Sequence, residues 1–139
     1  MRFAALALMA SVTSLGAGAC SLTPSGSECH SDVQCGDDVC ARGGECLARA
    51  SVREVTVKWT VNGEAASAAA CATHPDLYIQ FYGADYGDTL RLPVSCRDGS
   101  YSAASVPKRY VQIELGVDGG TGDLSPIDPS GRVQLDLLQ

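Results

Sequence analysis

The segment Val55 to Val61 (VTVKWTV) alternates apolar and polar residues along its whole length. Successive side chains of a β-strand point to opposite faces, so this alternation is typical of a strand with one buried face. The buried face is expected to hold Val55, Val57, Trp59 and Val61. The segment therefore predicts a strand that places Trp59, the only tryptophan, in a hydrophobic core.

The same alternation recurs along the rest of the chain. Four further runs lie at 77–81, 90–94, 111–117 and 133–137, with a weaker one at 101–106. Turn residues separate these runs. The Ala-rich stretch Glu64 to Ala72, followed by His74-Pro75, predicts one short helix. Without the spacing of βαβ units, residues 52–139 are expected to form an all-β fold, a small antiparallel β-sandwich of immunoglobulin-like or transthyretin-like kind.

The segment 29–47 has a different composition, because its cysteines follow the spacing C-x5-C-x4-C-x5-C and few aliphatic residues accompany them. So short a stretch cannot build a core, and disulfides are expected to hold it instead. Zinc, with His30 as a spare ligand, is the alternative, but structural zinc sites favour closer C-x2-4-C pairs. Outside this segment, Cys71 and Cys96 remain to pair with each other.

The start of the chain reads as an export signal. Met1-Arg2 is followed by an uncharged stretch to Leu15, which predicts a signal peptide over residues 1–19. Cleavage before Cys20 leaves 20–28 as an N-terminus and spacer. Seven cysteines are present. If Cys20 is modified, six remain and can pair fully, whereas ordinary secretory cleavage at Ala17-x-Ala19 would leave an unpaired thiol in an oxidising compartment.

Three segments resemble those of known families. The run Leu15 to Cys20 resembles a bacterial lipobox, with Ala17 where the family usually has Leu. This resemblance implies that Cys20 is lipidated as in palmitate-bearing lipoproteins, and Ser21 after it implies sorting to the outer membrane. A chain without that modification would be secreted.

The cysteine-rich segment, with turns at Cys35-Gly36 and Gly43-Gly44, resembles EB or Dickkopf-like modules, whose pairing implies the disulfides Cys29–Cys40 and Cys35–Cys46. The strand text 55–63, 79–82 and 109–115 resembles β-sandwich domains of uncharacterised myxobacterial lipoproteins, which implies a fold and no mechanism.

Composition and motifs exclude several classes of function. Ten Lys and Arg against 16 Asp and Glu give a net charge of −6, which disfavours nucleic acid as a partner. The G-x-S-x-G, H-E-x-x-H, P-loop and G-x-G-x-x-G patterns are absent, and His30 and His74 are the only histidines. We expect a non-enzymatic cell-envelope lipoprotein without a cofactor, attached to the membrane through its lipid. The alternative is a secreted, disulfide-rich ligand-binding or protease-inhibitor-like protein.

Two weaker hypotheses concern binding residues. Asp118 and Asp123 flank three glycines, and with Asp128 they offer oxygen ligands for calcium, although such clusters are also ordinary turn sequence. Tyr78 and Tyr82 lie opposite the apolar face of their run, and together they would form a stacking platform for a protein or glycan partner in the envelope.

Overall fold

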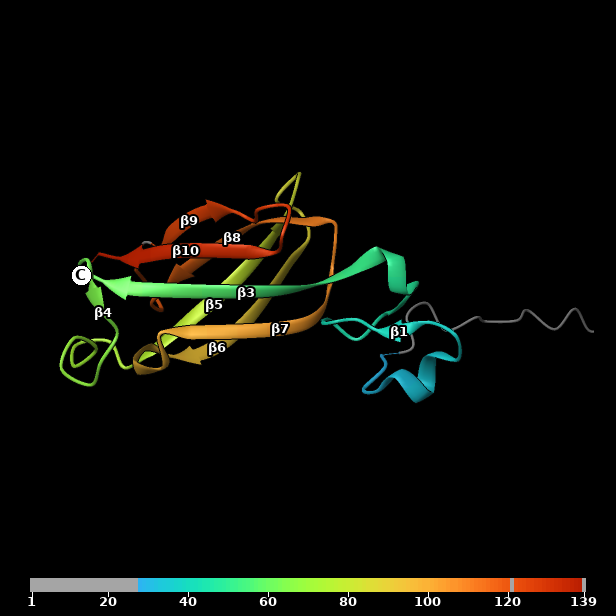
Figure 1. The fold of residues 1–139 in the computed structure, drawn as a ribbon, viewed down its shortest axis with the longest axis horizontal. Helices are drawn as coiled ribbons and strands as arrows, with labels where there is room; N and C mark the ends of the chain where they lie inside the picture. The colour runs from blue at the N-terminus through green and yellow to red at the C-terminus, as the bar shows by residue number, and fades with distance from the viewer. Residues whose placement is uncertain (1–27, 121, 139) are drawn as a thin grey trace, which may run out of the picture.

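The computed structural model describes residues 28–120 and 122–138. The expected signal peptide at 1–19, the lipidation site Cys20 and spacer residues 21–27 lie outside the described residues. The described chain is elongated, with the cysteine-rich segment at one end and the C-terminus at the other (Figure 1). None of its helices is long and apolar enough to cross a membrane.

The cysteine-rich segment, called the knot below, contains little regular structure. A 3-10 turn, η1 (Asp32–Cys35), precedes β1 (Val39–Cys40), which pairs antiparallel with β2 (Cys46–Leu47). A second 3-10 turn, η2 (Arg49–Ser51), then leads directly into β3 (Val52–Val61). The knot therefore joins the next domain without a linker.

Residues 52–137 form two four-stranded sheets that face each other across a shared core (Figure 1). The first sheet is built around β3, with β10 (Arg132–Leu137) on one side and both β7 (Ser100–Pro107) and β4 (Glu64–Ala65) on the other. The second sheet has the order β6 (Thr89–Ser95), β5 (Asp76–Gly83), β8 (Tyr110–Gly116) and β9 (Asp123–Pro126). The expected all-β fold, a small sandwich preceded by a disulfide-knotted segment, is confirmed.

One strand pairing differs from an entirely antiparallel arrangement. β10 runs parallel to β3, with Arg132 beside Thr56 and Leu137 beside Val61. β9 and β10 follow each other in sequence but belong to different sheets, so the chain crosses between the layers at residues 127–131. Because no hairpin links β3 to β10, their relative direction is set by packing and not by a turn.

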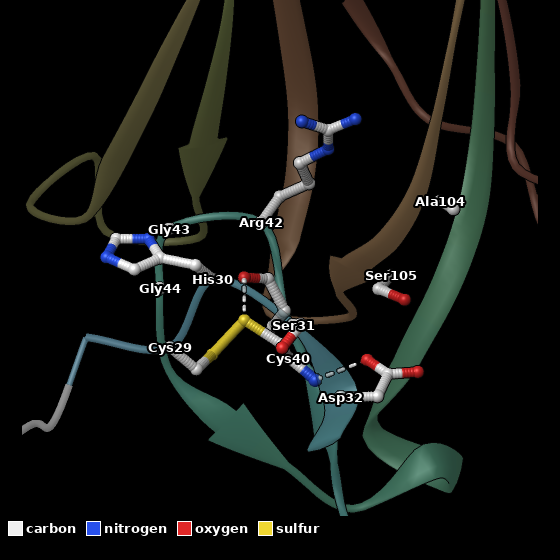
Figure 2. A pocket seen from close by; sticks show the side chains of 11 residues that line it. Cys29, His30, Ser31, Asp32, Cys40, Arg42, Gly43, Gly44, Ala104 and Ser105 are labelled. Atoms are coloured by element: carbon white, nitrogen blue, oxygen red, sulfur yellow. Dashed lines mark hydrogen bonds between the residues drawn. A yellow bond between two sulfur atoms is a disulfide. The ribbon is translucent and has the colours of Figure 1, made fainter. Parts of the chain in front are cut away.

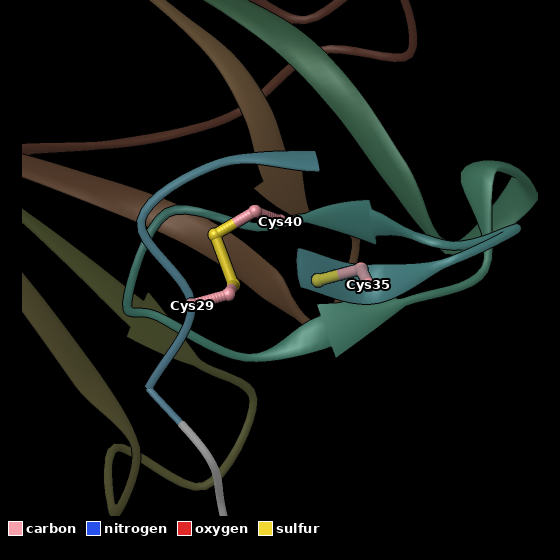
Figure 3. A group of neighbouring side chains, drawn as sticks. All are labelled: Cys29, Cys35 and Cys40. Carbon is pink, nitrogen blue, oxygen red and sulfur yellow. A yellow bond between two sulfur atoms is a disulfide. The ribbon is translucent and has the colours of Figure 1, made fainter. Parts of the chain in front are cut away.

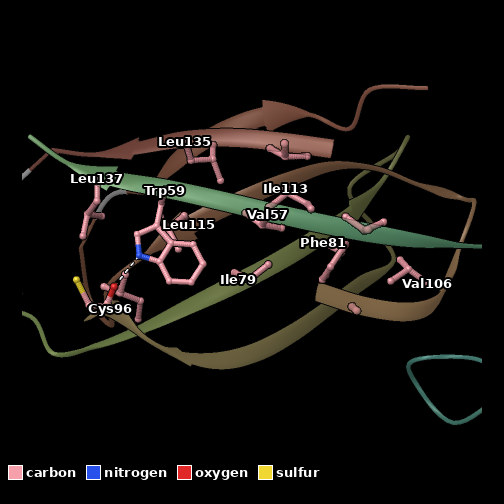
Figure 4. Close-up of a cluster of buried hydrophobic side chains, with 14 of the residues drawn as sticks. Val57, Trp59, Ile79, Phe81, Cys96, Val106, Ile113, Leu115, Leu135 and Leu137 are labelled. Atoms are coloured by element: carbon pink, nitrogen blue, oxygen red, sulfur yellow. Dashed lines mark hydrogen bonds between the residues drawn. The ribbon is translucent and has the colours of Figure 1, made fainter. Parts of the chain in front are cut away.

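The core lies between the two sheets and contains the residues that alternation predicts (Figure 4). Trp59 is 3% exposed, and its indole Nε1 donates a hydrogen bond to the Cys96 carbonyl at 2.8 Å. The predicted disulfide Cys71–Cys96 is present at the same end of the core. Full burial of Trp59 is tolerated because its polar atom has a partner.

The helix predicted over Glu64 to Ala72 is wrong. Asn62 and Gly63 both have positive φ, 51° and 79°, the backbone of a tight hairpin turn, so Glu64 and Ala65 turn back and pair with β3. Two isolated hydrogen bonds of helical type follow, from the Cys71 amide to the Ser67 carbonyl at 2.9 Å and from the Ala72 amide to the Ala69 carbonyl at 3.3 Å. The disulfide to Cys96 and the turn at Asn62 together override the helical propensity of alanine.

The alternation in 111–117 is interrupted at its first residue. Tyr82 pairs with Gln112 while Gly83 pairs with Tyr110, so Val111 is the extra residue of a β-bulge. Val111 is 39% exposed and Tyr110 is 2% exposed. Strict alternation over 111–117 predicts that Val111 faces the core with Ile113. This prediction is wrong, and the Tyr110 ring takes that place against Phe81, with the ring centroids 5.9 Å apart.

Candidate functional site

The knot is held by the two disulfides that its resemblance implied. Cys29 is bonded to Cys40 and Cys35 to Cys46, so both pairings are confirmed. The sulfur atoms of Cys29, Cys35 and Cys40 lie within 4.8 Å of one another, which makes them the one candidate metal cluster among the described residues (Figure 3). Metals bind thiolates, and these sulfurs are bonded in disulfides, so the oxidised knot has no thiolate ligand to offer zinc.

Hydrogen bonds to short polar side chains complete the knot. The Gln34 Oε1 atom accepts bonds from the amides of His30 (2.6 Å) and Ser31 (3.2 Å). The carboxylate of Asp32 accepts a bond from the Cys40 amide at 2.9 Å. These bonds satisfy backbone amides of the knot that have no partner in a strand ladder.

The knot contacts the sandwich through an irregularity in β7. The register between β3 and β7 shifts so that Ala104 and Ser105 oppose the single residue Glu54, and Ser105 has a positive φ of 56°. This β-bulge turns the Ser105 carbonyl outward. The carbonyl then accepts a hydrogen bond from the Arg42 amide at 2.9 Å. A distortion of the sandwich thus provides the attachment point for the knot.

A second contact is electrostatic. The Arg109 guanidinium forms ion pairs with Glu45 of the knot and with Asp88 of the loop before β6. The Tyr110 hydroxyl also bonds to Asp88, at 3.1 Å. The hydrogen bond from Arg109 lowers the pKa of Asp88, more than partial burial raises it. Arg109 therefore joins the knot to the sandwich through two carboxylates, one from each.

A hollow of about 460 Å³ lies where the knot meets β7 (Figure 2). One wall is formed by Ala104 and Ser105 of the β7 bulge, and the other by knot residues that include His30, Asp32 and Arg42. Arg42 is exposed and forms no ion pair with any residue in the described ranges. The hollow therefore offers an unpaired cation beside main-chain groups of a sheet edge.

The predicted aromatic platform is present on the outer face of the second sheet, but its own neighbours cover it. The Tyr78 hydroxyl donates to one carboxylate oxygen of Glu114 at 2.6 Å, and the Tyr82 hydroxyl donates to the other. The Arg91 guanidinium lies 3.6 Å from the centroid of the Tyr78 ring. Tyr78 is consequently only 9% exposed, so its ring face is not free for a glycan.

The shared carboxylate changes the acidity of both phenols. Burial, followed by the hydrogen bond to Glu114, raises the pKa of Tyr78 to about 12. The hydrogen bond to Glu114 is the main cause that raises the pKa of Tyr82 to about 12. Gly116 allows this packing, because a Cβ there would lie 2.6 Å from the Tyr78 hydroxyl oxygen. The two hydroxyls and the carboxylate of this cluster therefore satisfy one another's hydrogen bonds, which is a structural role.

The three aspartates considered for calcium have separate partners. Asp118 pairs with Arg91, Asp123 accepts a bond from the Asp136 amide at 3.0 Å, and Asp128 accepts one from the Arg132 amide at 2.8 Å. Their carboxylates do not form a candidate metal cluster in residues 28–120 and 122–138. The structure therefore does not bring Asp118, Asp123 and Asp128 together as ligands.

Comparisons with known proteins give no match: no family model, no curated protein and no solved structure is similar to this chain.

Sequence reasoning missed the residues that position the knot. Arg109, Asp88 and Glu45 lie in three separate segments, and no pattern in the sequence connects them. Arg42 and Ser105 meet through main-chain atoms, which leave no signature in side-chain type. The bulge at Ala104 and Ser105 likewise carries no glycine that would have marked it.

Proposed function

We propose that this protein is a non-enzymatic lipoprotein of the bacterial cell envelope, an interaction or structural module attached to the outer membrane through lipidated Cys20. The observation that carries the proposal is the cysteine pairing. Six of the seven cysteines form three disulfides in the described residues, which leaves Cys20 as the one cysteine outside them. Three disulfides are typical of an exported protein, in which an unpaired thiol is uncommon.

The direct attachment of the knot supports a role as a display module. The knot lies at one end of the elongated chain, and the C-terminal end of β10 lies at the other (Figure 1). Arg109 and Arg42 hold the knot against the sandwich, so an anchor that precedes the knot would direct the opposite end of the sandwich away from the membrane. Several acyl chains on one residue would make this attachment durable.

Mass spectrometry of the mature protein tests the anchor. We expect an N-terminal Cys20 that carries a diacylglyceryl group and release of the protein from membranes by detergent. The matched control is Cys20→Ser, which changes no described residue and should yield a water-soluble exported chain with all three disulfides. An unmodified Cys20 thiol in the wild-type protein would end the lipoprotein proposal.

A second candidate function, a protease-inhibitor-like knot, is favoured by Val33. This apolar residue is 92% exposed in the η1 turn, which the Cys29–Cys40 and Cys35–Cys46 disulfides constrain. A constrained loop binds with a low ordering cost. Serine proteases that accept small aliphatic residues, such as elastase-type enzymes, are the probe. This function is favoured if the wild-type protein inhibits such a protease and Val33→Glu, with Val39 and the disulfides intact, does not. Absence of inhibition by the wild type excludes it.

A further inference from the structure

Two edge strands of the sandwich are blocked by proline. In the second sheet, the bonds from the Cys96 amide to Pro75 and from the Gly83 amide to Asp88 fix the ladder, so even-numbered β6 residues face β5. Pro93 therefore occupies an outward position in the middle of β6. On the opposite edge, the bond from the Ile127 amide to the Val111 carbonyl places Pro126 of β9 outward. Each proline removes a donor that an added strand would need.

The third edge, β10, is covered by carboxylates near both of its ends. Its odd-numbered residues face β3, as the bond from the Asn62 amide to the Leu137 carbonyl shows. Of the outward amides, that of Arg132 donates to Asp128 and that of Asp136 donates to Asp123. Two of the three acidic residues that the sequence suggested for calcium thus satisfy edge donors of the first sheet.

The fourth edge is formed by the short β4 and by β7, and β7 is open over part of its length. The bond from the Trp59 amide to the Gly99 carbonyl sets the ladder, so Tyr101 and Ala103 face β3 and the backbone groups of Ser100 and Ser102 point outward. Within residues 28–120 and 122–138, no other segment pairs with these outward groups. Ser100 and Ser102 are exposed and small, so their side chains leave the edge accessible.

The open edge leads to the hollow beside the knot. Beyond Ser102, the chain enters the bulge at Ala104 and Ser105, where the Arg42 amide already bonds to the Ser105 carbonyl as an added strand would. Ala104 and Ser105 also line the hollow that contains Arg42. The main-chain groups of the β7 edge can bind the backbone of any extended peptide. The Arg42 side chain beside them would favour peptides with a negative charge at that position.

We propose that the Ser100–Ala104 edge of β7 binds an extended peptide segment of another exported protein, with an acidic side chain or terminal carboxylate of that segment at Arg42. The peptide adds one strand to the first sheet, and its backbone bonds to Ser100 and Ser102. The proposal rests on the proposed role as an interaction module. It does not depend on the lipid at Cys20.

Short linear peptides selected from a random phage-displayed library on the Cys20→Ser chain are the probe. Selected peptides should be enriched in acidic residues at one end. Their binding should protect the amide hydrogens of Ser100 and Ser102 from exchange, while Tyr101 and Ala103 are protected already in the free protein. Ser102→Pro removes an outward donor and no main-chain bond to β3, and should weaken peptide binding about tenfold or more. It also removes the side-chain bond between the Ser102 and Thr56 hydroxyls, so Ser102→Ala, which loses that bond and keeps the amide, is its control and should bind peptide as the wild type does. Arg42→Ala should weaken it several-fold and reduce its salt dependence.

Thr89→Pro is the matched control, because it adds an outward proline to the already blocked β6 edge, and it should leave peptide affinity unchanged. If Ser102→Pro lowers the thermal unfolding midpoint, its weaker binding could reflect loss of folding. In that case Ser100→Pro and the amide protection pattern of the wild type test the same contact with the peptide backbone. The proposal fails if no peptide binds, if bound peptides leave Ser100 and Ser102 unprotected, or if these amides become protected with rising protein concentration alone, which would assign the edge to a second copy. None of these outcomes changes the mass of Cys20, so the anchor is tested separately.

Discussion

The knot at residues 29–47 and the sandwich at residues 52–137 are stabilised by different means. The knot buries only Cys29, Val39 and Ala41, and two disulfides supply its constraints. The sandwich has a core of 17 buried residues and a single disulfide. Burial dominates where enough apolar residues alternate along strands, and covalent links take over where they do not. We therefore expect the two regions to respond to different perturbations.

The largest effect should come from the sandwich core. Phe81 is fully buried, so Phe81→Ala removes a ring that packs on Tyr110 and leaves a cavity. We expect a loss of about 3–5 kcal/mol in the free energy of unfolding, measured by denaturant titration with Trp59 fluorescence. Val33→Ala in the knot is the control and should change nothing measurable, because Val33 is 92% exposed. Equal effects of the two substitutions would contradict the division of roles.

Removal of the sandwich disulfide should be the next largest change. The Cys71→Ala, Cys96→Ala double variant opens a link between residues 25 apart in sequence. By the loop-closure estimate this costs about 3.5 kcal/mol. It also loosens the Cys96 carbonyl that accepts the Trp59 indole bond, so the fluorescence maximum of the folded state should move to longer wavelength. A loss below about 1 kcal/mol would show that the core, and not the disulfide, holds the Ala-rich loop.

Loss of a knot disulfide should loosen the knot and leave the stability of the sandwich nearly unchanged. In Cys35→Ala, Cys46→Ala, the Cys29–Cys40 bond remains, but η1 loses its link to β2. We expect rapid cleavage within 30–38 by a non-specific protease, because few buried groups hold this segment. The unfolding free energy of the sandwich should fall by less than about 1 kcal/mol, since distant sites act independently. A cooperative loss of both regions would contradict this expectation.

A smaller effect is expected where the two regions meet. Arg109→Ala removes both ion pairs, and because the partners are about 40% exposed the loss should be at most about 1 kcal/mol. The pKa of Asp88 is lowered from 3.8, so its contribution is present above that value and is lost as the pH falls through the folded pKa. Exchange of the Arg42 amide should therefore rise in the variant at neutral pH, and in the wild type only in acid. Unchanged exchange in the variant would remove Arg109 from the attachment.

The smallest effect at neutral pH belongs to the tyrosine cluster. Glu114→Gln removes the negative charge that both hydroxyls face, so the phenol pKa values should fall from about 12 toward 10.0, more for Tyr82, whose shift comes mainly from Glu114. Ultraviolet absorbance of phenolate measures this. Because the folded pKa values are raised, the cluster stabilises the wild type below pH 10 and loses that contribution between pH 10 and about 12. An identical titration of the variant would show that Glu114 does not control these groups.

Much of the architecture follows from local patterns in the chain. Period-two alternation predicted β3, β5, β10 and the burial of Trp59, because side-chain direction in a strand depends only on residue parity. Cysteine spacing and parity, with a family resemblance, predicted the disulfides that hold the knot. Pro93 and Pro126 also held a usable signal, since proline within a strand indicates an edge position.

The tertiary structure alone decided what depends on contacts between distant segments. The parallel pairing of β10 with β3, the bulge at Val111 and the non-helical path of 66–72 each replace a local preference by packing or a covalent link. The same holds for Arg109 between Glu45 and Asp88, and for Asp123 and Asp128, which bond to β10 amides instead of converging on a cation. Alternation depends on neighbouring residues, and a cysteine count needs no structure, so both can be read from the sequence alone. Which edge stays open at Ser100 and Ser102 is settled only when all four edges are brought together in space.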